Sequence, residues 1–280
     1  MTVAEQKLAL ACAVEAARAA GVVMRKNLHA AKRVNEAAPH DIKLELDVRC
    51  QRLIEARLRA RFPDAAVLGE EGDAGDDQAA ARWVIDPIDG TVNFAHGIPH
   101  ACVSIALQVT GDAWRAASAE APARGRNRAT RHPSHVTLVG VVYDPFLDEM
   151  WSARRGCPAR LNGRVIHVSR RNKLADALVA LGFPKSDAAI EQNLASLVAL
   201  AHRARKVRLM GSAALALTYV ASGRFDAYLE RGIRLWDIAA GGLIVECAGG
   251  DFWHEPAEEA GAYRMLATNG LLRQQLPPLT

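Results

Sequence analysis

Apolar residues recur at helical spacing in two stretches near the start of the chain. The pattern over residues 3–30 predicts an amphipathic helix. A second helical period covers 47–62, and Pro63 predicts its end. Two short apolar strands are expected next, at 66–69 and 83–85, on either side of a polar loop.

The rest of the chain alternates between strand-like and helix-like patterns, with a tight hairpin turn at 161–164. The expected strands are 102–109, 138–143, 149–153, 177–181, 207–210 and 225–229, and the expected helices are 189–204, 213–222 and 236–248. The first half therefore has an α+β pattern and the second an α/β pattern. A boundary is expected near 140–155. Because no flexible linker lies there, we expect the halves to share a core.

Composition narrows the class of protein. Half of the 280 residues are apolar, yet no apolar run approaches the ~20 residues of a membrane span. Charges interrupt the N-terminal apolar stretch, which favours a helix over a signal peptide. The five cysteines are dispersed, as expected of reduced thiols in a cytoplasm. The net charge of +4 suits an anionic substrate without implying nucleic acid.

The segment 86–91, Asp-Pro-Ile-Asp-Gly-Thr, is the strongest chemical signal in the sequence. Asp86 and Asp89 stand at the end of an apolar strand, and two carboxylates so close repel each other unless a cation lies between them. Mg²⁺ prefers such oxygen ligands. Gly90 and Thr91 offer backbone N–H groups to an anion where a helix or turn begins. A site for metal and phosphate is indicated. The alternative is an ordinary Asp-Pro/Asp-Gly turn.

Two further acidic segments support the metal interpretation. A Gly-Glu-Glu stands at 69–71 after a short strand, and a Trp-Asp-x-Ala-Ala-Gly stands at 236–241 at the head of a small-residue helix. Together with Asp-Pro-Ile-Asp-Gly-Thr-x-Asn-Phe at 86–94, they reproduce three patterns in order. In these motifs the chain resembles the inositol monophosphatase family of Mg²⁺-dependent, lithium-sensitive phosphatases. The resemblance runs from the first helix to about residue 270.

The resemblance implies a layered αβαβα sugar-phosphatase fold, in which residues 1–280 form a single inositol monophosphatase-like domain. Its α+β half would cover about 1–150 and its α/β half about 151–280. The implied protein is a cytoplasmic homodimer with two or three Mg²⁺ ions and no membrane or nucleic-acid partner.

The implied reaction is hydrolysis of inositol-1-phosphate, or of a related polyol or sugar monophosphate, by a metal-activated water. Some relatives cleave fructose 1,6-bisphosphate, histidinol phosphate or nucleotide 3′-phosphates, so the substrate stays open. A regulatory binding protein that keeps the scaffold is the other alternative, because some bacterial relatives also bind transcription machinery. The complete carboxylate set argues against an inactive scaffold, since unpaired acids are costly.

The resemblance also assigns the metal and catalytic residues one by one. The implied metal ligands are Glu70, Asp86, the Ile88 carbonyl, Asp89 and Asp237. Asp237 could also serve as a helix N-cap. The Thr91 hydroxyl, backed by Asp47, would orient the attacking water and accept its proton, and Glu70 completes the catalytic set.

Substrate contacts follow from the same resemblance. They are Gly90, Thr91, Ser212, Ala213, Glu230 and Arg234. Glu230 matches the acid that grips a ring hydroxyl in inositol-specific relatives. Arg234 stands where many relatives carry a histidine, and it either reaches a second anionic group or forms a local salt bridge. Trp236 is expected in the core.

The sequence departs from the family pattern in two places. Relatives usually show Asp-x-Val-Thr-x-x-Asp where residues 41–47 read Asp-Ile-Lys-Leu-Glu-Leu-Asp. Lys43 could contact a substrate phosphate or pair with Glu45 or Glu71, which leaves substrate identity in doubt. Residues 112–135 form an apparent basic insertion, expected as a solvent-facing excursion away from the metals. A basic contact for nucleic acid or an acidic partner, or a lid, are the alternatives.

Overall fold

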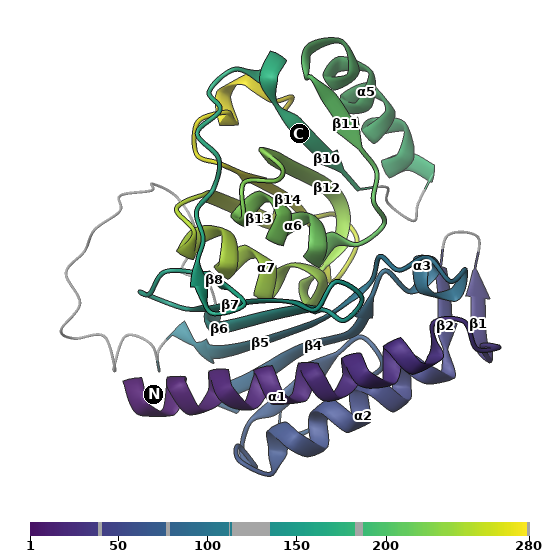
Figure 1. Ribbon diagram of the computed structural model, residues 1–280, viewed down its shortest axis with the longest axis vertical. Coiled ribbons are helices and arrows are strands. Elements are labelled where there is room, and N and C mark those ends of the chain that lie inside the picture. Colours follow the sequence, from purple (N-terminus) through teal and green to yellow (C-terminus); the bar gives the residue numbers. More distant parts are fainter. Residues whose placement is uncertain (39–40, 77–78, 112, 114–134, 183–186, 279–280) are drawn as a thin grey trace.

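Two large β-sheets alternate with three layers of helices in the structure, a computed structural model, which also contains a separate two-stranded sheet (Figure 1). It describes residues 1–38, 41–76, 79–111, 113, 135–182 and 187–278. The order of layers is helices, larger sheet, helices, smaller sheet, helix. The predicted αβαβα arrangement is therefore present.

The first helical layer consists of α1 (Val3–Asn27) and α2 (Glu45–Arg59), which pack on the larger sheet. The Thr2 hydroxyl accepts a hydrogen bond from the backbone N–H of Glu5, and the Glu5 carboxylate accepts one from Thr2, so this capping box fixes the start of α1. Both predicted helices are present, and each ends about three residues earlier than its sequence pattern. A two-stranded hairpin of β1 (Val34–Ala38) and β2 (Asp41–Leu44), which the sequence analysis did not predict, lies between them.

The larger sheet has seven strands in sequence order. They are β3 (Ala66–Gly69), β4 (Ala81–Asp89), β5 (Cys102–Thr110), β6 (His135–Asp144), β7 (Glu149–Arg154), β8 (Arg160–Leu161) and β9 (Arg164–Val165). Only β3 and β4 run parallel among these neighbours. The sheet continues to Val165, and the boundary at 140–155 stays a prediction.

The predicted insertion at 112–135 lies outside the described residues, apart from Ala113 and His135. Its flanks are described: Thr110 pairs with His135 in the antiparallel ladder of β5 and β6. The chain therefore leaves and re-enters the sheet at adjacent positions.

The smaller sheet contains five strands in the order β11-β10-β12-β14-β13. Their bounds are β10 (Leu178–Leu181), β11 (Lys206–Arg208), β12 (Ala227–Arg234), β13 (Asp251–Pro256) and β14 (Ala262–Thr268). Helix α5 (Asp187–Arg203) covers the outer face. The sequence analysis missed β13 and β14 and ended β12 five residues early. Glu230 and Arg234 consequently lie within a strand.

Helices α6 (Ala213–Ala221) and α7 (Leu235–Cys247) lie between the two sheets. A single cluster of buried residues joins them to strands of both sheets, so the halves share this core. The packing is close enough to require small residues. A Cβ on Gly140 of β6 would lie 2.7 Å from the Ala240 carbonyl oxygen, and a Cβ on Gly242 would lie 2.3 Å from the Phe252 ring.

Two more findings bear on the class of protein. All five cysteines are unpaired thiols. Among the described residues, none of the helices combines the length and the apolar character that crossing a membrane requires.

Candidate active site

The acidic segment at the end of β4 contains a proline. Pro87 has no N–H to donate, and the pairing of β4 with β5 shifts register between Asp86 and Asp89. The Asp86 carboxylate accepts a hydrogen bond from the Ile88 backbone N–H at 3.0 Å. Gly90 follows with φ +92° and precedes the short helix α3 (Thr91–Ala95). A Cβ there would lie 2.9 Å from the His100 carbonyl oxygen, so this turn requires glycine.

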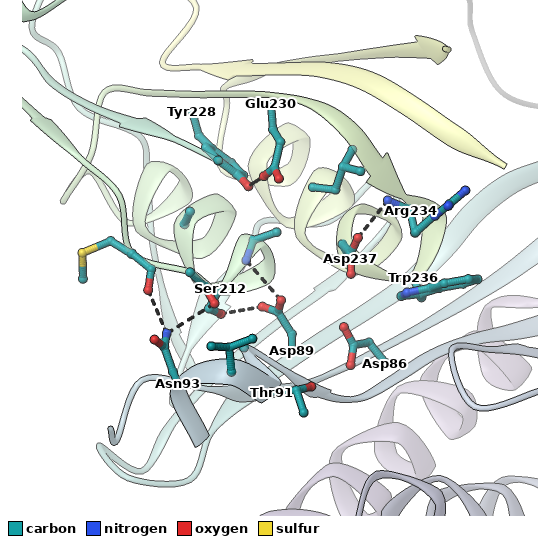
Figure 2. A pocket seen from close by; sticks show the side chains of 18 of the residues that line it. Asp86, Asp89, Thr91, Asn93, Ser212, Tyr228, Glu230, Arg234, Trp236 and Asp237 are labelled. Carbon is teal, nitrogen blue, oxygen red and sulfur yellow. Dashed lines mark hydrogen bonds between the residues drawn. The ribbon is translucent and has the colours of Figure 1, made fainter. Parts of the chain in front are cut away.

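Three aspartates converge at this turn from distant parts of the sequence. Each of Asp86, Asp89 and Asp237 offers a carboxylate oxygen, and these oxygens all lie within 4.8 Å of one another. Asp86 and Asp89 come from β4, and Asp237 comes from the first turn of α7. Figure 2 shows the three side chains facing a common space. The two predicted segments thus meet at one point.

Burial and mutual repulsion make these carboxylates costly to ionise. Burial raises the pKa of Asp86 well above its usual value, and the neighbouring Glu70, Asp89 and Asp237 carboxyls raise it further. Burial, and then Asp89 and Glu70, likewise raise the pKa of Asp237. A divalent cation would offset this cost, and a donor set made only of oxygens fits Mg²⁺. The residues present therefore fit the metal that the sequence predicts.

Asp89 also accepts hydrogen bonds from the N-terminal end of α6. Its carboxylate accepts hydrogen bonds from the Ser212 hydroxyl and from the backbone N–H groups of Ala213 and Ala214, at 3.1 and 2.8 Å. These donors lower the pKa of Asp89, but burial outweighs them and raises it. Ser212 and Ala213 are thereby held against the acidic cluster.

Asp47 and Asp237 share one local motif. Each lies three residues beyond the N-cap of its helix and accepts the backbone N–H of that N-cap residue at 2.8 Å, from Leu44 and Arg234 respectively. Asp237 is therefore not itself the N-cap that the sequence allowed. Leu44 stands where relatives usually have threonine, and its contribution to Asp47 is a backbone donor that any residue except proline supplies.

The predicted site residues line one pocket, with a single exception. The cavity has a volume of about 800 Å³, and its lining includes Glu70, Asp86, Ile88, Asp89, Gly90, Thr91, Ser212, Ala213, Glu230, Arg234 and Asp237. Asp47 is 1% exposed and does not line it. The Thr91 hydroxyl donates to the Ile88 carbonyl at 2.8 Å. The pairing of Thr91 with Asp47 stays a prediction.

Residues that the sequence analysis left without a role also line this pocket. Tyr228 is buried, and its hydroxyl donates a hydrogen bond to the Glu230 carboxylate (Figure 2). Strand periodicity could have found it, since positions two apart in β12 share a face. Trp236, expected in the core, is half-buried and lines the pocket. Glu259 lies between β13 and β14, in a turn that the sequence analysis did not predict.

Asn93 joins the two rims of the pocket. Its amide donates to the carbonyls of His100 and Met210, at 2.9 and 2.8 Å. Met210 lies between β11 and α6, so one side chain links the turn after β4 to the segment that carries Ser212. The residue belongs to the conspicuous motif at 86–94, but spacing alone did not reveal this role.

Arg234 forms the local salt bridge that the sequence analysis left as an alternative. Its guanidinium pairs with Glu259 and donates to the Ala260 carbonyl at 2.8 Å. Figure 2 shows the side chain directed away from Asp86 and Asp89.

Known proteins resemble the chain over nearly its whole length. The model of the inositol monophosphatase family matches residues 5–126 and 132–274. A protein of Xylella fastidiosa named Nus factor SuhB is 37% identical, with 88% of this chain and 81% of that protein covered. Inositol monophosphatase 1 of Solanum lycopersicum is 33% identical, with 95% and 92% covered. The solved inositol monophosphatase of Anabaena superposes with a TM-score of 0.76 at 35% identity, covering 96% of each chain.

Proposed function

Because this chain belongs to the inositol monophosphatase family, we propose that it is a Mg²⁺-dependent phosphomonoesterase. The observation that carries the proposal is the cluster of Asp86, Asp89 and Asp237 in a large pocket. Its substrate class is the monophosphate of inositol or of a related polyol or sugar. The relatives named as inositol monophosphatases support this choice.

The acidic residues would hold the metal. Asp86, Asp89 and Asp237, with Glu70 and the Ile88 carbonyl, would bind two or three Mg²⁺ ions. When bound, Mg²⁺ would neutralise the phosphate and make a water more acidic. Asp86 lies among the other carboxylates and would be one of the metal ligands.

Other residues would place the substrate and the water. Gly90 and Thr91, at the start of α3, would contact the phosphate, and the Thr91 hydroxyl with Asp47 would orient the attacking water and take its proton. Ser212 and Ala213 would face the polyol at the start of α6. The Glu230 carboxylate, held by the Tyr228 hydroxyl, would accept a hydrogen bond from a substrate hydroxyl. Catalysis would rest on positioning and electrostatics.

A phosphate-release assay with a small panel tests this proposal. The panel contains inositol 1-phosphate, fructose 1,6-bisphosphate, histidinol phosphate and 3′-phosphoadenosine-5′-phosphate, each with Mg²⁺ and with excess chelator. We expect turnover of inositol 1-phosphate that disappears with the chelator. Turnover that persists without metal, or none on any compound, would refute the proposal.

A regulatory binding role is the second candidate, favoured by the similarity to proteins named Nus factor SuhB. The two roles are compatible on one scaffold. A chain that lacks Mg²⁺-dependent turnover but is retained by transcription proteins would support regulation alone. Family resemblance also supports a cytoplasmic homodimer, and light scattering after gel filtration tests the dimer.

A further inference from the structure

The ion pair of Arg234 and Glu259 lines the same pocket as Glu230. Arg234 is the last residue of β12, and Glu259 lies in the turn between β13 and β14. The Arg234 guanidinium bonds both the Glu259 carboxylate and the Ala260 carbonyl. The turn is closed by its own backbone, since Ala262 N–H donates to the Glu259 carbonyl at 3.0 Å. Arg234 thus holds the turn against the end of β12.

The charges around the pocket are strongly unequal. Among its described lining residues, Arg234 carries the one cationic side chain, whereas six residues are acidic: Glu70, Asp86, Asp89, Glu230, Asp237 and Glu259. Metal ions would compensate the acids around Asp86. Glu230, which is proposed to bind a substrate hydroxyl, lies on the same strand as Arg234, four residues before it. The one cation among the described lining residues is therefore already paired with Glu259.

We propose that Glu259 is a specificity determinant that occupies Arg234 and so disfavours substrates with a second phosphate. The inference rests on the proposed phosphatase function and deepens it. A second phosphate on the leaving group would meet the Glu259 carboxylate and would have to displace it from Arg234. A neutral hydroxyl needs neither. Discrimination here comes from a repulsive element, a common source of specificity.

Neutralising Glu259 tests the inference. The Glu259→Gln variant keeps the size and hydrogen-bonding capacity of the side chain but removes its charge. We expect the binding preference for inositol 1,4-bisphosphate over inositol 1-phosphate, given as the ratio of their dissociation constants, to rise about tenfold. This change corresponds to ~1.4 kcal/mol. The effect is limited because the Glu259 side chain is 59% exposed and the charge is partly screened. The Arg234→Gln variant removes the cation, so its preference should fall below that of the wild type.

The same hairpin offers a matched control. Glu255 pairs with Arg264 across β13 and β14, has a 41% exposed side chain and does not line the pocket. In Glu255→Gln the preference should stay within about twofold of wild type, as expected of a surface ion pair. An equal rise in Glu255→Gln and Glu259→Gln would overturn the inference, as would no change in both pocket variants.

Binding and turnover are measured separately. Dissociation constants for the two inositol phosphates are obtained by calorimetry with Ca²⁺, and rates are obtained with Mg²⁺. The ratio of dissociation constants decides the inference about Glu259. The presence of Mg²⁺-dependent turnover decides the proposed function, so failure of one is distinguished from failure of the other.

Discussion

Single residues at this site occupy positions that are unfavourable without a ligand. Asp86 is 1% exposed, and burial together with three neighbouring carboxyls raises its pKa. A buried like-charge cluster lowers the stability of the empty protein and is relieved when a cation binds. Such a loss of stability is expected where residues are placed for function rather than for folding.

Asp86→Asn should abolish Mg²⁺-dependent turnover and yet stabilise the metal-free protein. Replacing the carboxylate with an amide removes repulsion from Glu70, Asp89 and Asp237, which we expect to raise stability by about 1 kcal/mol, or ~2–4 °C in melting temperature. Phosphate release and thermal melts with chelator measure the two effects. A variant that retains turnover would show that Asp86 is not a metal ligand.

Ca²⁺ should inhibit the wild type, and family resemblance predicts inhibition by Li⁺.

Thr91→Ala and Asp47→Asn should lower kcat far more than they raise KM. Both residues are proposed to act on the attacking water rather than on the bound substrate, so the loss falls in the transition state. General-base assistance is worth about 10²–10⁴-fold. Steady-state kinetics on inositol 1-phosphate measures it. If both variants stay within a few-fold of wild type, another group activates the water.

Gly182→Ala should act as an indirect substitution of Glu230. A Cβ at position 182 would lie 1.8 Å from a Glu230 carboxylate oxygen, and this flexible carboxylate, rather than the backbone, would have to move. We expect kcat/KM on a polyol phosphate to fall about tenfold or more, as for loss of a hydrogen bond to a charged group. An aryl phosphate without hydroxyls should be nearly unaffected. Glu230→Gln provides the direct comparison, and equal losses on both substrates would mean that Glu230 is structural.

At the scale of elements, the site depends on contacts between turns and helix ends. Helix α3 and the end of β4 are linked to the segment before α6, because Asn93 donates to the Met210 carbonyl and the Asp89 carboxylate accepts a hydrogen bond from the Ser212 hydroxyl. These are side-chain bonds between segments more than one hundred residues apart. The elements themselves are regular, and the accuracy of the site lies in how their ends are joined.

Asn93→Ala should therefore weaken the contact between the two sides of the pocket without unfolding α3 or α6. Carbonyls of His100 and Met210 lose their donor, a change worth about 1–3 kcal/mol. We expect a lower melting temperature together with lower kcat/KM. Asn27→Ala is the matched control, since its amide donates within α1, to Val23 at 2.7 Å, and to no other described residue. A similar loss of kcat/KM in the control would contradict the linking role of Asn93.

At the scale of the whole molecule, the described flanks of the segment 112–135 allow its replacement. Because Thr110 and His135 pair directly, a short turn can join β5 to β6. Replacing residues 113–134 by such a turn should leave kcat/KM and the melting temperature nearly unchanged. A large loss of turnover would support the lid alternative, and salt-sensitive RNA binding that vanishes with the deletion would support the basic contact.

The helices and the acidic segments leave local patterns in the sequence, whereas the order of the layers was implied by the resemblance to the inositol monophosphatase family. Helical periodicity marked α1 and α2, and the motif at 86–94 marked two of the three clustered aspartates. Strands β13 and β14 were missed because several of their residues are polar and partly exposed, which obscures alternation. Glu259 was missed because its relation to Arg234 exists only after these strands pair. Long-range contacts of this kind leave no spacing to read.

Because its residues are small where the sheets contact it, α7 acts as a spacer between the two sheets. Gly140 meets Ala240, and Gly242 meets Phe252, so the thickness of one helix sets how far apart the two sheets stand. Asp86 and Asp89 belong to one sheet, and Asp237 belongs to the spacer itself. Residues of α7 that do not line the pocket therefore also set the geometry of the proposed metal site. Larger side chains in this helix would move Asp237 away from the other two aspartates and weaken that site in a protein that still folds.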